Sequence, residues 1–226
     1  MFEELIYKTS EVINIISIVI AFVVLITFQK LSFPLRIFGY YLIIDCGTEI
    51  LSSALANNNY NNLVFFHIYT FLEFWFISIF FFHVLGIKNK IYLFLTLFIV
   101  ESLVIINSIF FQSIFEFNTY SSSLAIVIIL TMCLFYFYKS LEYTIDDFEF
   151  KTIHKLIILL FFYECLSLMI ILFSNHLVIA GKSYHLTVYG IRALIVLFIK
   201  IIYLFIYIVY VFKKTSYINK LSNYFL

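Results

Sequence analysis

Long apolar segments separated by short polar stretches constrain this chain more than any other feature of its sequence. Inside a bilayer, a segment must satisfy its own backbone hydrogen bonds, and an α-helix of about 17–25 mostly apolar residues does so. The sequence therefore predicts an all-α polytopic membrane protein, a single domain over residues 1–226. Its seven expected transmembrane helices cover residues 12–28, 37–56, 63–85, 91–111, 119–138, 156–173 and 188–212.

The composition supports lipid as the solvent of this chain. Hydrophobic residues make up 64% of the sequence and charged residues only 12%, against about 25% charged residues in soluble domains. The net charge of +1 provides no basic stripe for phosphates, so nucleic acid is excluded as a partner. Cys46, Cys133 and Cys165 lie in apolar segments without CxxC spacing and are interpreted as small buried side chains.

The positive charges of the loops predict the orientation. Two of them, Lys8 and Lys182, lie in the N-terminal segment and the even-numbered loops. Ten lie in the odd-numbered loops and the C-terminal tail: Lys30, Arg36, Lys88, Lys90, Lys139, Lys151, Lys155, Lys213, Lys214 and Lys220. Lysine and arginine concentrate in cytoplasmic loops. We therefore expect the N-terminus outside and the C-terminus in the cytoplasm, with a bacterial cytoplasmic membrane as the location.

Two of the segments share a short pattern. The second contains Glu-Ile-Leu-Ser from Glu49, and the sixth contains Glu-Cys-Leu-Ser from Glu164. In an arrangement of three, one and three helices, which some transporters use, these patterns fall at equivalent positions. Seven-helix sugar exporters and vitamin carriers have that layout, but the prolines typical of the sugar carriers are absent here. Chance similarity between two apolar helices also explains the pattern, and no family is assigned.

Ionisable residues near the middle of the predicted helices are the strongest functional signal. A charged group at mid-bilayer costs roughly 2.5–3.5 kcal/mol on insertion scales, and such groups usually face the bundle interior or a water-filled cavity. Because several helices carry one at a similar depth, we predict a shared polar centre that binds a ligand or ion. Its candidate residues are Asp45, Glu49, Glu73, Glu101, Glu164 and Lys200.

The charges of this predicted centre do not balance, since five acids face only Lys200 and Arg192. Either some carboxyl groups are protonated or a bound cation completes the centre. In a purely structural alternative, the bases pair with two acids and the other acids hold helices together through hydrogen bonds. We interpret Lys200 as the cationic member of an ion pair with Glu73 or Glu164. Gly47, between two acids, is expected to allow close backbone approach.

The predicted function is a membrane carrier or conduit for a small cationic solute or for protons. The alternative is a seven-helix receptor or sensor that signals through a partner protein bound to the charged loop 139–155. A structural subunit of a larger complex, or a homo-oligomer, is also open. No catalytic motif such as HExxH or GxSxG occurs, so we expect no enzyme, catalytic residue or cofactor. Whether His67, His176 and His185 bind a metal stays open.

Overall fold

The computed structural model describes the backbone of residues 2–58, 60–115, 118–141, 147–180 and 182–222. Side chains are described for residues 7–58, 60–115, 118–141, 147–173, 188 and 190–215. The described residues form seven α-helices and one short 3-10 turn, Phe28–Lys30. The helices are α1 Phe2–Thr27, α2 Phe33–Asn57, α3 Leu63–Val84, α4 Lys90–Phe110, α5 Thr119–Ser140, α6 Phe148–Ala180 and α7 Lys182–Ser222.

Six of these helices are long and apolar enough to cross a membrane, which supports an integral membrane protein. The exception is α2, which has sufficient length but carries Arg36, Asp45 and Glu49. Pro34 lies in the first turn of α2, where a missing backbone N–H group breaks no helical hydrogen bond. At the end of α3, Gly86 adopts a positive φ of 65°, and this turn redirects the chain toward α4.

Three helices extend well beyond the predicted apolar segments. The structure begins α1 at Phe2 and α6 at Phe148, whereas the segments were expected to begin at residues 12 and 156. It also extends α7 from Lys182 to Ser222. The prediction counted only apolar residues, whereas a helix continues through polar residues that satisfy the same backbone geometry. Residues 142–146 of the charged loop lie outside the described residues.

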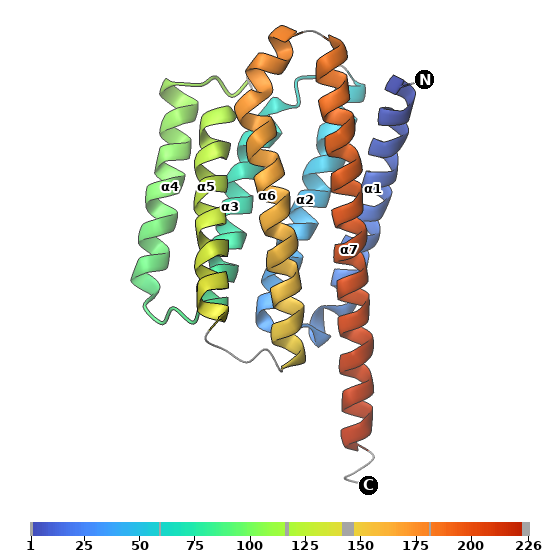
Figure 1. Cartoon of the computed structure of the whole chain (residues 1–226). Helices are drawn as coiled ribbons and strands as arrows, with labels where there is room; N and C mark the ends of the chain where they lie inside the picture. Colours follow the sequence, from blue (N-terminus) through green and yellow to red (C-terminus); the bar gives the residue numbers. More distant parts are fainter. Residues whose placement is uncertain (1, 59, 116–117, 142–146, 181, 223–226) are drawn as a thin grey trace.

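Six of the helices form a closed ring, and the seventh packs outside it (Figure 1). Around the ring, neighbours are in contact in the order α1, α2, α3, α5, α6 and α7, and α7 returns to α1. By contrast, the main contacts of α4 among the described residues are with α3 and α5, at the periphery. The order places α1–α3 and α5–α7 as two consecutive triplets with α4 between them in sequence.

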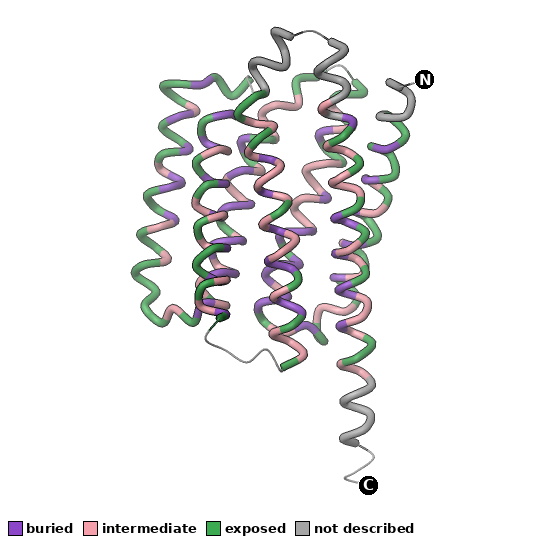
Figure 2. Tube along the Cα trace, in the orientation of Figure 1, coloured by how far each residue is buried: buried purple, intermediate pink, exposed green. Residues whose placement is uncertain are grey.

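Apolar side chains cover the outside of this bundle. Figure 2 shows the alternation of buried and exposed residues along each helix, and α4 is exposed over most of its surface. Its exposed side chains include Tyr92, Phe94, Phe98, Ile99 and Phe110. Exposed apolar surface of this extent is unfavourable in water but matches a hydrocarbon environment.

The interior near the C-terminal end of the ring is filled by an aromatic plug, formed by Phe38, Phe80, Tyr203 and Tyr207. All four side chains are buried. The Phe38 ring lies 5.3 Å from the Phe80 ring and 5.5 Å from the Tyr203 ring, centroid to centroid. The Tyr207 hydroxyl donates a hydrogen bond of 2.9 Å to the Leu35 carbonyl oxygen. This plug leaves the interior space of the ring on the other side, toward its N-terminal end.

Close approach between helices occurs at Gly39 and not at Gly47. A Cβ atom on Gly39 would lie 2.7 Å from Val24 Cγ1, so α1 packs tightly against α2 at this position. A Cβ atom on Gly47 would meet nothing within 4 Å. The expectation of close packing at Gly47 is therefore wrong.

Candidate functional site

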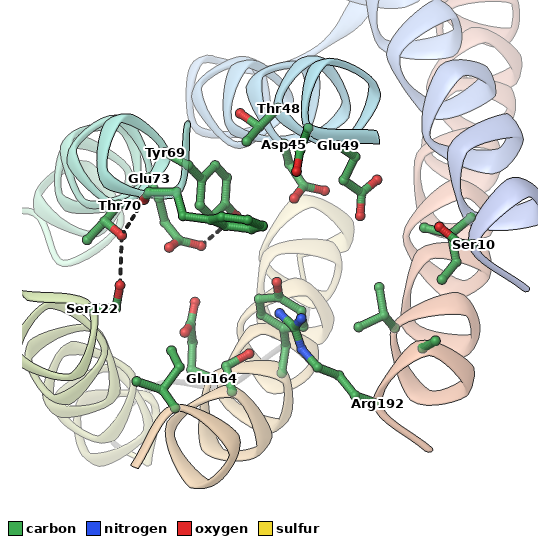
Figure 3. Close-up of a pocket in the computed structure, with 18 of the residues that line it drawn as sticks. Ser10, Asp45, Thr48, Glu49, Tyr69, Thr70, Glu73, Ser122, Glu164 and Arg192 are labelled. Carbon is green, nitrogen blue, oxygen red and sulfur yellow. Dashed lines mark hydrogen bonds between the residues drawn. The ribbon is translucent and has the colours of Figure 1, made fainter. Parts of the chain in front are cut away.

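A polar cavity of about 340 Å³ occupies the N-terminal half of the ring. All six ring helices line it, and α4 does not. Its charged lining residues are Asp45 and Glu49 from α2, Glu73 from α3, Glu164 from α6 and Arg192 from α7. Hydroxyl groups complete the lining, from Ser10, Thr48, Ser52, Ser53, Tyr69, Thr70, Ser122, Tyr163 and Ser167. The close-up in Figure 3 shows these groups directed into one space.

A cluster around Lys200, the Lys200 cluster, lies beside the cavity. Lys200 forms an ion pair of 2.7 Å with Asp45 and a second, shorter one with Glu49. Its Nζ also donates a hydrogen bond of 2.7 Å to Ser17 Oγ, which in turn donates one of 2.7 Å to Glu49 Oε2. This cluster ties α7 to both α1 and α2. The predicted partners of Lys200, Glu73 and Glu164, are therefore wrong.

The exposure of this cluster increases toward the N-terminal end of the ring. The side chain of Lys200 is 6% exposed, that of Asp45 13% and that of Glu49 26%. On α2, which runs from the C-terminal to the N-terminal end, Glu49 lies one turn after Asp45. Of these three side chains, Glu49 is therefore both the most exposed and the nearer of the two acids to the N-terminal end of the ring.

A second group, the Arg192 cluster, comprises Glu73, Glu164 and Arg192. Glu73 accepts a hydrogen bond of 2.7 Å from the Tyr69 hydroxyl. Glu73 and Glu164 are buried. Within the described part of the chain, Glu164 Oε1 and Arg192 Nε are buried without a hydrogen-bond partner. Buried polar atoms without partners are rare in proteins. One acceptor atom and one donor atom of cavity-lining residues are therefore left unsatisfied.

Neutral side chains hold the neighbouring helices in register. Thr70 of α3 and Ser122 of α5 form a hydrogen bond of 2.9 Å, and Asn118 donates one of 3.0 Å to Thr70. Between α4 and α5, Asn107 donates a hydrogen bond of 2.8 Å to Ser121. Such interhelical hydrogen bonds stabilise helix association in lipid. They fix the α3–α5 side of the cavity.

Glu101 does not join the predicted centre. It lies on α4, outside the ring, and it does not line the cavity. Its side chain is buried, as predicted, but neither carboxyl oxygen has a hydrogen-bond partner among the described residues. Similar depth along the membrane was the basis for including Glu101, and depth alone does not specify which helices form the ring.

The other five predicted site residues are brought together. Asp45, Glu49, Glu73 and Glu164 line the cavity, and Lys200 binds two of them. Sequence reasoning omitted Arg192 from the site, although an arginine inside an apolar segment is itself a signal. It also missed Ser17, which no sequence pattern distinguishes from other serines in apolar helices.

Whether His67, His176 and His185 bind a metal together is not tested by the described residues. His67 Nδ1 lies 3.1 Å from Ser108 Oγ, within hydrogen-bond distance. The side chains of His176 and His185 lie outside the described residues. No group of three or more His, Cys, Asp or Glu residues that could hold a metal ion occurs in the described part of the chain.

Comparison with known proteins gives this site no precedent. No protein-family model matches the chain, and neither a curated protein nor a solved structure is significantly similar to it.

Proposed function

We propose that this chain is a membrane carrier for a small cation and that the polar cavity is its solute-binding site. The observation that supports this most is the charge of the cavity. Four carboxyl groups line the cavity. The basic groups are two, Arg192 in the lining and Lys200 beside it. Its volume of about 340 Å³ falls at the lower end of small-molecule sites, which measure ~300–1,000 Å³.

The proposed orientation places the N-terminus outside a bacterial cytoplasmic membrane, with all seven helices spanning it. The excess of lysine and arginine at the opposite end of the bundle supports this orientation. The cavity is then accessible from outside, and the aromatic plug separates it from the cytoplasm. Transport requires the two triplets to move relative to each other and open the plug, as repeats do in alternating access.

Within this mechanism the two basic residues have different roles. Lys200 already forms ion pairs with Asp45 and Glu49 in the absence of solute. A cation that enters the cavity is therefore bound first by Glu73 and Glu164, whose only basic neighbour in the cavity lining is Arg192. If these carboxyl groups release a proton when the cation binds, the same site couples the solute to protons.

Uptake of radiolabelled ethanolamine into proteoliposomes of phosphatidylglycerol tests this function. The assay is run at about pH 6.5, where an ordinary amine with a pKa of ~10 is charged. We expect uptake above that of protein-free liposomes for the wild type and loss of uptake for Glu73→Gln and Glu164→Gln. Glu101→Gln is the matched control, since Glu101 is an equally buried acid outside the ring. No wild-type uptake of ethanolamine, or loss in all three variants, would contradict the proposal.

A reporter-fusion experiment tests the proposed orientation. Fusions after Lys90, Lys155 and Lys214 are expected to report the cytoplasm, and fusions near Asn59 and Lys182 the outside. The alternation of charge along the loops is the reason. A cytoplasmic signal at Asn59 would overturn the orientation without affecting the ring of helices.

A further inference from the structure

An apolar groove of about 330 Å³ runs between α6 and α7 on the side of the bundle. Its apolar lining comes from Leu166, Met169, Ile170, Phe173, Ile191 and Ile195. Met169, Phe173 and Ile191 are exposed, so the groove is accessible from the surface that would face lipid. It lies in the same half of the molecule as the polar cavity.

The groove and the polar cavity share one wall. Tyr163, Ser167, Arg192 and Val196 line both spaces. Arg192 therefore stands at the junction of an apolar space and an acidic one. Glu73 and Glu164 line only the acidic space. Among the described lining residues, the two spaces therefore share one charged side chain, Arg192.

We propose that the amine which the cavity receives is the headgroup of a phospholipid, phosphatidylethanolamine being the best fit. An acyl chain occupies the groove, the phosphate binds Arg192, and the ammonium group binds Glu164 and Glu73. This inference rests on the proposed function and names the substrate class of the same site. The acyl chain of this ligand would meet the apolar groove, its anionic phosphate the guanidinium group, and its cationic ammonium group the carboxyl groups.

The unpartnered atoms match the hydrogen-bonding groups of this ligand. Arg192 Nε has an unused N–H group, and arginine binds phosphate through paired hydrogen bonds. Glu164 Oε1 is an unused acceptor, and a primary ammonium group has three N–H donors. A water-soluble zwitterion would satisfy the same two atoms but leave the groove unfilled. The groove therefore favours a ligand that carries a hydrocarbon chain.

Electron paramagnetic resonance of spin-labelled lipids tests the binding. The protein is placed in phosphatidylglycerol vesicles that contain a trace of chain-labelled phosphatidylethanolamine or, for comparison, chain-labelled phosphatidylglycerol. We expect the phosphatidylethanolamine probe to be restricted more strongly by the wild type. Arg192→Gln and Glu164→Gln should each weaken its relative association about tenfold, the effect of losing one charge-assisted hydrogen bond. Equal restriction of the two probes by the wild type would overturn the proposal.

A pair of tryptophan substitutions separates the groove from the general lipid surface. Ile191 in the groove and Ile99 on α4 have the same exposure of 54%. Ile191→Trp fills the groove and should reduce restriction of the phosphatidylethanolamine probe, whereas Ile99→Trp should leave it unchanged. An equal response of both variants would overturn the groove as the chain-binding site. Circular dichroism and size-exclusion profiles of each variant confirm that it is folded.

A competition experiment distinguishes this inference from the proposed function. Ethanolamine uptake is measured in pure phosphatidylglycerol liposomes and in liposomes that also contain phosphatidylethanolamine. The inference predicts that added phosphatidylethanolamine inhibits uptake by the wild type but not by Ile191→Trp. Uptake that is insensitive to the lipid would overturn the inference and retain the carrier for a free amine. No uptake in either liposome would overturn the carrier, and the spin-label result would then decide the lipid site separately.

Discussion

Two charged clusters share one helix but differ in how their charges are satisfied. Lys200 and Arg192 both belong to α7, eight residues apart. In the Lys200 cluster, the ammonium group binds Asp45, Glu49 and Ser17 directly. In the Arg192 cluster no ion pair joins Arg192 to Glu73 or Glu164 among the described residues, and Glu164 and Arg192 each keep an unpartnered atom. The basic group of one cluster is paired within the protein, whereas the other cluster keeps unpartnered polar atoms.

On the proposed function, this difference distinguishes carboxyl groups that stabilise the fold from carboxyl groups that bind the solute. A buried charge that is fully paired stabilises the arrangement of helices around it, because removal of one partner leaves the other without compensation. A buried polar group without a partner is unfavourable for folding, and its presence needs another explanation. The two clusters should therefore respond in opposite ways to neutral substitutions, and the following predictions test that contrast.

The largest expected effect is that of Lys200→Met. It leaves Asp45 and Glu49 buried beside each other without a cation, and the expected loss of stability is about 3–5 kcal/mol. Arg192→Met, in the other cluster, removes no ion pair and should change stability far less. Thermal unfolding of both variants in the same detergent, followed by circular dichroism, measures the difference.

Restoring neutrality should recover most of the loss. Asp45→Asn and Glu49→Gln, introduced together into the Lys200→Met protein, remove the two uncompensated charges. If the triple variant unfolds at the temperature of Lys200→Met alone, the ion pairs are not what stabilises this cluster. Equal destabilisation by Lys200→Met and Arg192→Met would remove the contrast between the clusters.

The next effect concerns the contact of α1 with α2 that holds Ser17 against Glu49. Gly39→Ala brings a Cβ atom within 2.7 Å of the buried Val24 side chain and should destabilise the protein by about 1–3 kcal/mol. Gly47→Ala is the control on the same helix, because its Cβ would meet nothing within 4 Å. It should stabilise the protein by roughly 0.5–1 kcal/mol, the helix preference of Ala over Gly. Chemical denaturation of both variants checks the signs, and destabilisation by Gly47→Ala would contradict this packing.

The sequence predicted where the helices lie along the chain more reliably than which helices contact one another. The segment 63–85 corresponds closely to α3, Leu63–Val84, because hydropathy records the solvent of each residue directly. Which helix contacts which depends on side-chain fit around the ring, and one sequence does not encode this as a period or motif. Glu101 illustrates the failure: its place near the middle of an apolar segment suggested a shared centre, but its helix lies outside the ring.

The two glutamates of the repeated pattern illustrate a partial success. Glu49 and Ser52 of α2, and Glu164 and Ser167 of α6, all line the cavity, as equivalent positions of two triplets would. The pattern did not predict that Glu49 binds Lys200 whereas Glu164 keeps an unpartnered oxygen. That difference comes from α7, which contacts α1 and α6 and carries its two basic residues eight positions apart.

A smaller effect is expected at the isolated acid. Glu101→Met replaces a buried carboxyl group, neither of whose oxygens has a partner among the described residues, by an apolar side chain of similar length. Removal of this unsatisfied group should raise stability by about 1–2 kcal/mol, the desolvation penalty of one polar group. The melting temperature should therefore increase while ethanolamine uptake stays unchanged. A lower melting temperature would show that Glu101 has a stabilising partner.

The smallest change in stability is expected for Glu164→Gln, which keeps the size of the side chain and removes only its charge. Because Glu164 forms no ion pair among the described residues, the substitution should alter stability by less than ~0.5 kcal/mol, as for sites without such features. Uptake of ethanolamine should nevertheless be lost, because the amide cannot compensate an ammonium group. Asp45→Asn gives the opposite pattern, since it weakens the ion pair with Lys200 and should lower the melting temperature. Melting temperature and uptake measured on the same two preparations test the contrast. A large stability loss for Glu164→Gln would place Glu164 among the structural carboxyl groups, and the two clusters would then no longer differ in kind.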